Sequence, residues 1–147
     1  MGKWYRRQRQ QRCALDGAPI EPIYAVKILG ADGGDLRFCC IRCAEYWLER
    51  QSDTGYQVRV TDEVTGHSIG ADDASFVRST IVTNHATGNR IHAFRRRADA
   101  EEHAAANRGR LLVGEDRPFQ PAAKAAESAR DLHQGKYRSP EKDGETR

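Results

Sequence analysis

The pattern of apolar and polar residues between positions 19 and 62 changes period twice. The run PIEPIYAVKIL is rich in β-branched and aromatic residues and predicts a strand, and the turn residues GADGGD connect it to a returning strand, LRFCC. From Ile41 to Gln51 the apolar residues recur at helical spacing. The alternating run YQVRVTD then predicts a half-buried strand. This part of the chain is therefore predicted as ββαβ.

The same order of predicted elements returns in the second half. SFVRSTIV (75–82) predicts a strand, TNHATGN a turn, and RIHAFR a second strand. The alanine-rich, charged run RADAEEHAAANRG predicts a helix that ends at Gly109, the residue type that a C-cap favours.

A short strand, RLLVG, closes the second unit, and Phe38 and Phe94 stand at equivalent places before the two predicted helices. We therefore predict an α+β fold in which two ββαβ repeats form one sheet-and-helix domain.

The predicted domain does not extend to either end of the chain. A chain of 147 residues is typical of one domain, and the apolar pattern fades at both termini. We predict a flexible basic N-terminus at 1–12, the domain at 13–119 and a solvated tail at 120–147. Within the tail, 122–134 has the composition of a marginal helix.

Charge and hydropathy limit the classes of partner. The net charge is +3, and the basic residues at the N-terminus could contact nucleic acid or an anionic membrane. No groove-reading motif follows them, so we expect no nucleic-acid partner. No apolar run approaches the about 18 residues that a membrane span needs, or forms the apolar core of a signal peptide. We therefore expect no membrane span and a cytoplasmic location.

The four cysteines are the candidate functional residues. Cys39, Cys40 and Cys43 lie at the end of a predicted strand and the start of a helix, and pairing of the predicted hairpin brings Cys13 toward the same end. In a reducing cytosol, clustered cysteines are expected as thiols or metal ligands. The start of a helix favours thiolate, so we expect lowered cysteine pKa values. Several thiolates together suit soft ions such as Cu(I) or Hg(II).

Three other interpretations of these cysteines remain open. They can be buried filler of the core. They can form a structural zinc site, with Cys40 or Cys39 paired to Cys43 and Asp16 standing where a zinc knuckle has a second cysteine. Alternatively, two thiolates can hold a soft metal while Asp16 passes a proton to a carbon atom bonded to that metal.

Two short segments resemble the active-site segments of organomercurial lyases. These are CALD at Cys13–Asp16 and FCC at Phe38–Cys40. The resemblance implies cleavage of a carbon–mercury bond by Cys13, Asp16 and Cys39, with Cys40 as a neighbouring thiol.

A longer stretch, from about Cys13 to Phe119, resembles the NosL family, the Cu(I)-binding accessory proteins of nitrous oxide reductase. The run VTDEVTGHSIGADDASFV (60–77) is its most recognisable part. The resemblance implies a ββαβ-repeat fold shared with the lyase core. NosL proteins also carry a methionine soon after the first cysteine, whereas the only methionine here is Met1.

The leading hypothesis is a cytoplasmic soft-metal binding protein that acts as a carrier, buffer or accessory factor. Its predicted ligands are Cys13, Cys39, Cys40 and Cys43, with Cu(I) as the first candidate ion and Zn²⁺ or Hg²⁺ as alternatives. His85 and His92 are weaker candidates from the second repeat. A protein acceptor for the ion and a homodimer are conceivable partners. The alternatives are an organomercurial-lyase-like enzyme, with catalytic residues Cys13, Asp16 and Cys39, and a structural zinc module.

Overall fold

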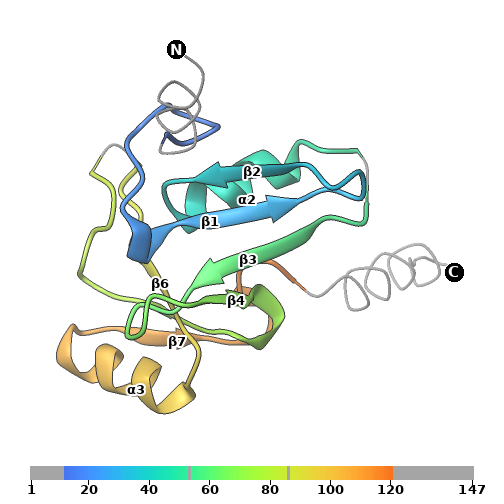
Figure 1. Cartoon of the computed structure of the whole chain (residues 1–147). Coiled ribbons are helices and arrows are strands. Elements are labelled where there is room, and N and C mark those ends of the chain that lie inside the picture. The colour runs from blue at the N-terminus through green and yellow to red at the C-terminus, as the bar shows by residue number, and fades with distance from the viewer. Residues whose placement is uncertain (1–11, 53, 86, 121–147) are drawn as a thin grey trace, which may run out of the picture.

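The structure is a computed structural model that describes residues 12–52, 54–85 and 87–120 (Figure 1). The predicted basic N-terminus and the predicted C-terminal tail, including its helix at 122–134, lie outside the described residues except for Arg12 and Gln120.

The first half of the described chain forms a four-stranded antiparallel sheet in the order β2-β1-β3-β4. Its strands are β1 (Val26–Leu29), β2 (Asp35–Phe38), β3 (Gln57–Thr61) and β4 (Ser68–Gly70). Helix α2 (Ile41–Glu49) follows β2 and packs against β1 and β2. A short 3₁₀ turn, η1 (Pro22–Tyr24), precedes β1.

The second half forms a three-stranded antiparallel sheet in the order β6-β5-β7. Its strands are β5 (Ser75–Arg78), β6 (Ile91–Phe94) and β7 (Arg110–Leu112). Helix α3 (Arg97–Ala106) covers this sheet and packs mainly against β5 and β7 (Figure 1). Two further 3₁₀ turns are present: η2 (Ala71–Asp73) precedes β5, and η3 (Gly114–Asp116) follows β7.

The predicted repeat of two ββαβ units is confirmed. In each unit the first strand lies in the middle, between the second strand and the strand that follows the helix. The registers agree as well: Val26 at the start of β1 pairs with Phe38, and Ser75 at the start of β5 pairs with Phe94. The α+β prediction holds, but hydrogen bonding divides the strands into two sheets, and β4 is an additional strand that was not predicted.

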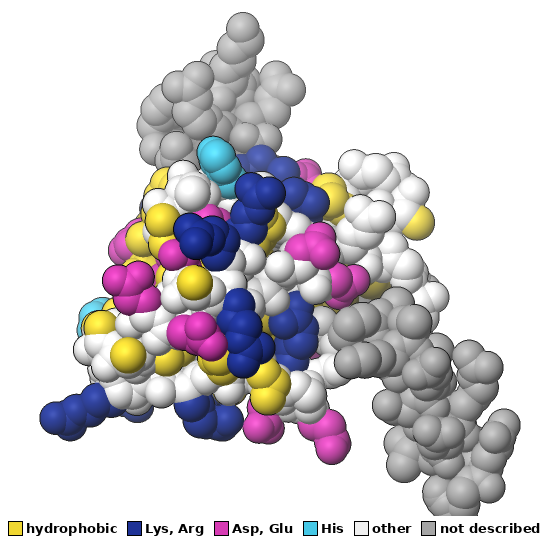
Figure 2. All heavy atoms as spheres, turned by 90° about the horizontal axis from the view of Figure 1, so that it is seen from below, with side chains coloured by type: hydrophobic (Ala, Val, Ile, Leu, Met, Phe, Trp, Pro, Cys, Tyr) yellow, Lys and Arg dark blue, Asp and Glu magenta, His cyan; other side chains and the backbone are white. Residues whose placement is uncertain are grey.

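The core lies where the two sheets and α2 meet. One buried cluster combines residues of both halves, including Ile28, Phe38, Val60 and Phe76, and it also includes all four cysteines. A smaller cluster joins α3 to its own sheet. Within the described ranges, no helix has the length and apolar character needed to cross a bilayer. On the face shown in Figure 2, basic and acidic side chains are interspersed among the described residues.

The end of α3 differs from the prediction that the helix ends at Gly109 in the position of a C-cap. The residue with positive φ is Arg108, at 52°, and the Gly109 amide donates to the Ala104 carbonyl at 2.8 Å, as in a Schellman motif. A Cβ atom at position 109 would lie 2.7 Å from the Arg78 carbonyl oxygen. Glycine is therefore required at position 109 because the connection between α3 and β7 packs closely against β5, and not because of the φ angle of Gly109.

Candidate metal centre

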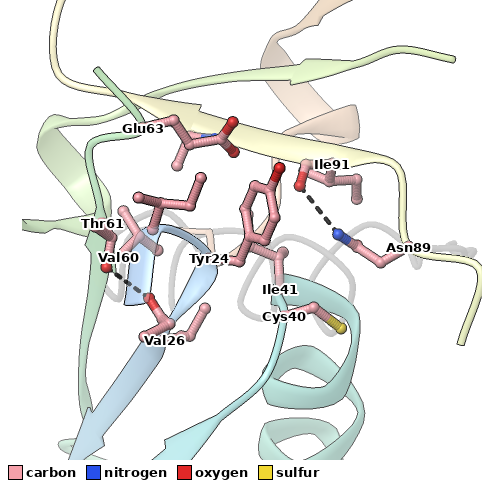
Figure 3. Close-up of a pocket in the computed structure, with 12 residues that line it drawn as sticks. Tyr24, Val26, Cys40, Ile41, Val60, Thr61, Glu63, Asn89 and Ile91 are labelled. Carbon is pink, nitrogen blue, oxygen red and sulfur yellow. Dashed lines mark hydrogen bonds between the residues drawn. The ribbon is translucent and has the colours of Figure 1, made fainter. Parts of the chain in front are cut away.

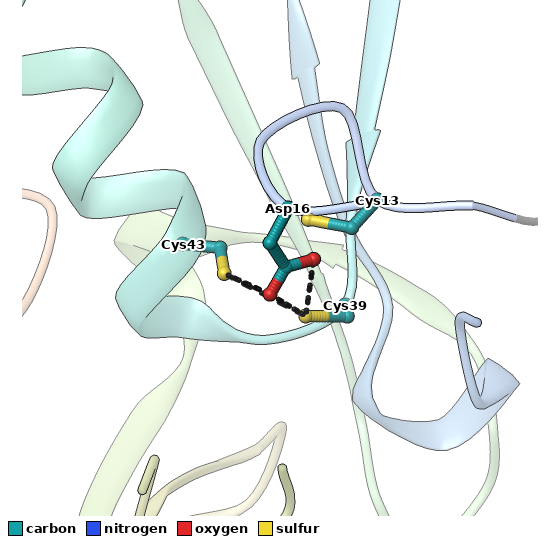
Figure 4. Close-up of side chains that lie close together, drawn as sticks. All are labelled: Cys13, Asp16, Cys39 and Cys43. Carbon is teal, nitrogen blue, oxygen red and sulfur yellow. Dashed lines mark hydrogen bonds between the residues drawn. The ribbon is translucent and has the colours of Figure 1, made fainter. Parts of the chain in front are cut away.

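Four side chains from three segments meet at one end of the first hairpin: Cys13, Asp16, Cys39 and Cys43 (Figure 4). Their sulfur and carboxylate oxygen atoms all lie within 4.8 Å of one another. Cys13 and Asp16 come from a turn that precedes η1, Cys39 from the junction between β2 and α2, and Cys43 from the first turn of α2. The arrangement is a group of donor atoms that could hold a metal ion.

Backbone hydrogen bonds hold the turn that carries Cys13 against the end of β2. The Cys13 amide donates to the Ala18 carbonyl at 2.8 Å, and the Gly17 amide donates to the Cys13 carbonyl at 2.9 Å. Gly17 has φ of 74°, which glycine adopts without a steric penalty. The Ala14 amide donates to the Arg37 carbonyl of β2 at 2.8 Å. This last bond places Cys13 beside the β2–α2 junction.

The junction itself brings Cys39 and Cys43 together. Cys40 is the N-cap of α2 and has an extended backbone conformation. Cys39 therefore lies two residues before Ile41, the first residue of the helix. The Cys39 and Cys43 sulfur atoms lie 3.6 Å apart. Tetrahedral zinc–thiolate sites have Zn–S bonds of about 2.3 Å, which corresponds to sulfur–sulfur distances of about 3.8 Å. The two thiols are therefore already spaced as ligands of one ion.

Asp16 is the solvent-facing member of the group. Its carboxylate accepts from the Ala18 amide at 2.9 Å and lies 3.5 Å from the Cys43 sulfur and 3.8 Å from the Cys39 sulfur. Asp16 is exposed, whereas Cys13, Cys39 and Cys43 are at most 4% exposed. Partial burial opposes its ionisation, yet the hydrogen bonds from Ala18 and from the three thiols lower the pKa of the Asp16 carboxyl.

The expected lowering of the cysteine pKa values at the start of α2 is not observed. Burial, followed by the negative charges that Cys40 and Cys13 would carry, raises the pKa of Cys39 to about 12 and also raises the pKa of Cys43. Desolvation and the repulsion between neighbouring thiolates therefore oppose the effect expected of a helix N-terminus. The thiols of Cys39 and Cys43 are protonated near neutral pH.

Cys40, predicted as a further ligand, lies outside this group. Its sulfur is 3.5 Å from the Thr87 hydroxyl oxygen. It also lines a separate small cavity, which it shares with Tyr24, Glu63 and Asn89 (Figure 3). The N-cap position turns Cys40 away from its neighbour Cys39, so the two adjacent thiols have different surroundings.

The two candidate histidines also lie outside the group. His92 is fully buried, with Nδ1 2.9 Å from a Glu63 carboxylate oxygen and Nε2 2.9 Å from the Ile81 carbonyl oxygen. Burial alone lowers the pKa of His92, but its hydrogen bond and charge interaction with Glu63 give a net rise. His85 is exposed in the connection between β5 and β6. His92 therefore links β6 of the second half to Glu63 of the first half.

Asn84 contacts the group and was not found from the sequence. It belongs to the β5–β6 connection, and its side-chain amide donates to the Cys39 sulfur at 2.8 Å. The two residues are 45 positions apart, and the run TNHATGN carries only the composition of a turn. The second repeat therefore contributes a hydrogen-bond donor to a group whose sulfur atoms all come from the first.

Comparisons with known proteins support the fold. Neither a protein family profile nor a curated protein sequence matches the chain. Among solved structures, the crystal structure of the copper chaperone NosL from Shewanella denitrificans is similar, with a TM-score of 0.63 and 23% sequence identity. The match covers 76% of this chain and 92% of that chain. The resemblance to organomercurial lyases stays a prediction. The predicted resemblance to NosL is confirmed at the level of the fold: the chain has a NosL-like α+β fold.

Proposed function

We propose that this protein is a carrier or accessory factor for a thiophilic metal ion, held by the thiolates of Cys13, Cys39 and Cys43. The observation that carries the proposal is that a distant turn brings a third buried sulfur to a pair that is already spaced as metal ligands. Cys40, whose sulfur lies outside this group, is not part of the proposed ligand set.

Cu(I) is the first candidate ion. Thiolate ligands select Cu(I), zinc and iron–sulfur clusters over hard cations. The similar fold of a copper chaperone supports the same choice. All four cysteines are free, which agrees with action in the cytoplasm, where thiols stay reduced.

The exposure of Asp16 favours a carrier over a structural site. Structural zinc sites are closed by their four protein ligands, whereas sites that exchange a ligand keep an open position. Here the three sulfur atoms are buried, but the fourth side of the group is a carboxylate on an exposed turn. An ion held by the sulfurs can be reached, and handed to an acceptor, from this side.

The proposal is tested by anaerobic purification, elemental analysis and thiol counting. We expect one Cu(I) per chain in competition with a chromophoric Cu(I) chelator, with three of the four thiols protected from alkylation. Copper that leaves all four thiols reactive would contradict the ligand set. One zinc ion whose removal unfolds the protein would instead support a structural module, because the binding energy would then be folding energy.

Metal affinity is expected to increase with pH. The raised pKa of Cys39 means that a metal must displace its proton, and Cys43 is raised in the same direction. Binding that releases two protons strengthens about 100-fold per pH unit below the thiol pKa values. Cu(I) competition titrations at several pH values, with a chelator of known protonation, measure this slope. An affinity that is constant with pH would show that the ligands are not protonated thiols.

Removing the Asn84 side-chain amide is expected to weaken metal binding. Hydrogen-bond partners of metal ligands typically contribute about 10–100-fold in affinity, so we expect a loss of this size for Asn84→Ala. Asn107→Ala is the matched control, because Asn107 donates to a backbone carbonyl of α3 instead of to a sulfur atom. Equal affinities of the two variants would show that the bond to Cys39 does not orient the ligand.

A second candidate function rests on the position of the Asp16 carboxylate, 3.5 Å and 3.8 Å from two thiols. In an organomercurial-lyase-like reaction, a thiol that binds mercury gives its proton to the Asp16 carboxylate. Asp16 then transfers this proton to the mercury-bonded carbon, which keeps the electron pair of the broken carbon–mercury bond, while mercury stays on the thiolates. Asp16→Asn should then abolish turnover of an organomercurial while Hg(II) still binds. The carrier proposal predicts no turnover by either protein.

A further inference from the structure

We propose that Asp16 determines how well the site binds divalent ions relative to monovalent Cu(I). This inference rests on the proposed metal-binding function. The three thiolates alone hold Cu(I), whereas a divalent thiophilic ion such as Zn²⁺ takes the Asp16 carboxylate as its fourth ligand. Asp16 is thus a specificity-determining residue of a site with three sulfurs and one oxygen.

The three distances among the donor atoms of Asp16, Cys39 and Cys43 match the edges of a tetrahedron of this composition, and the Cys13 sulfur lies within 4.8 Å of the other three. Zn–S bonds of about 2.3 Å and Zn–O bonds of about 2.1 Å at tetrahedral angles place a sulfur and an oxygen ligand about 3.6 Å apart. The Asp16 carboxylate oxygen nearest the thiols lies 3.5 Å from the Cys43 sulfur and 3.8 Å from the Cys39 sulfur. The Cys39 and Cys43 sulfurs are 3.6 Å apart, close to the expected sulfur–sulfur edge.

The turn prepares the carboxylate for this role. One Asp16 oxygen accepts the Ala18 amide at 2.9 Å, and Gly17 provides the positive φ that closes the turn. This bond leaves the other oxygen directed at the thiols, as Figure 4 shows. A fourth ligand is therefore in place before an ion arrives, so little conformational entropy is lost when it coordinates.

Donor chemistry and charge separate the two classes of ion. Cu(I) is soft and is satisfied by sulfur, so a carboxylate adds little to its affinity. Zinc in proteins is almost always four-coordinate and accepts aspartate oxygen, so it lacks one ligand without Asp16. Three thiolates and a carboxylate also carry more negative charge than a monovalent ion can balance in a buried site, and a divalent ion balances more of it.

The test compares Zn²⁺ and Cu(I) affinities in the full-length protein and in Asp16→Asn. We expect the Zn²⁺ dissociation constant to rise by at least about tenfold, a loss no smaller than that of a ligand's hydrogen-bond partner. The Cu(I) dissociation constant should change by less than about threefold, because its sulfur ligands are intact. In Co²⁺-substituted protein, the visible d–d bands should change in the variant, which reports loss of the oxygen ligand.

Asp32→Asn is the matched control. Asp32 lies in the β1–β2 turn, at the opposite end of the hairpin, and accepts the Gly34 amide at 3.0 Å in the same i to i+2 manner. Asp16→Ser is a second variant, because a hydroxyl keeps an acceptor for the turn but removes the carboxylate. Both variants at position 16 should lose Zn²⁺ affinity, and Asp32→Asn should keep it.

The outcomes distinguish this inference from the proposed function. Wild-type protein that binds Cu(I), together with position-16 variants that keep their Zn²⁺ affinity or lose both affinities equally, would overturn the role of Asp16 and leave the carrier in place. Wild-type protein that binds no Cu(I) through its thiols would overturn the proposed function whatever the variants do.

Discussion

Replacing Cys39 and Cys43 together with serine is expected to abolish tight metal binding. Their sulfurs are 3.6 Å apart and supply two of the three proposed thiolates. Four-ligand zinc sites are worth about 10–16 kcal/mol in total, or about 3 kcal/mol per ligand. Loss of two ligands should therefore weaken binding by at least about 1000-fold. Competition with a chromophoric chelator, under anaerobic conditions, measures the change.

Cys40→Ser is the control for this double variant. Cys40 is as buried as Cys43 and adjacent to Cys39, but its sulfur lies beside the Thr87 hydroxyl. A serine at position 40 keeps a hydrogen-bonding group there, so we expect wild-type metal affinity. If Cys40→Ser lost as much affinity as the double variant, the proposed ligand set would be wrong and all four sulfurs would have to take part.

Truncating Phe38 is expected to lower the stability of the fold strongly. Phe38 is completely buried at the end of β2, and its ring packs against that of Trp47 with centroids 5.8 Å apart. Phenylalanine-to-alanine changes in a core cost about 3–5 kcal/mol, a large part of the about 5–15 kcal/mol that stabilises a typical domain. Equilibrium unfolding in denaturant, with metal-free protein, measures the loss.

The repeat provides the control for Phe38→Ala. Phe94 occupies the equivalent position at the end of β6, but it belongs to the smaller cluster around α3 and not to the cluster that contains the cysteines. Phe94→Ala should cost a similar free energy of unfolding. Only Phe38→Ala should also weaken metal binding by the folded protein, since Phe38 directly precedes Cys39. Equal metal affinities of the two folded variants would contradict this coupling between core and site.

Local patterns were enough to predict the repeat. Residues that pair in a hairpin or share a helical turn are close in the chain, so their spacing and period carry the information. The strand–helix order of both halves follows from these patterns, as does the equivalence of Phe38 and Phe94. The closeness of Cys39 and Cys43 is local in the same way, because four residues span one turn.

Details that depend on packing were not predicted. The division into two sheets and the added strand β4 depend on which strand edges meet. Glycine is the residue type expected at a helix C-cap. What excludes a larger residue at position 109, however, is the nearby carbonyl of Arg78 on β5. The pKa values of Cys39 and Cys43 are raised, opposite to the prediction, because burial is a property of the fold and not of the position in a helix.

The sequence by itself determined that this chain folds as two ββαβ units with a cysteine pair at the start of the first helix. Only the tertiary structure decided which residues make up the candidate metal centre. A backbone bond from Ala14 to Arg37 brings in Cys13 and Asp16, the second repeat adds Asn84, and the N-cap excludes Cys40. Secondary structure follows from neighbours along the chain, whereas a metal centre is assembled by long-range contacts that no local period encodes.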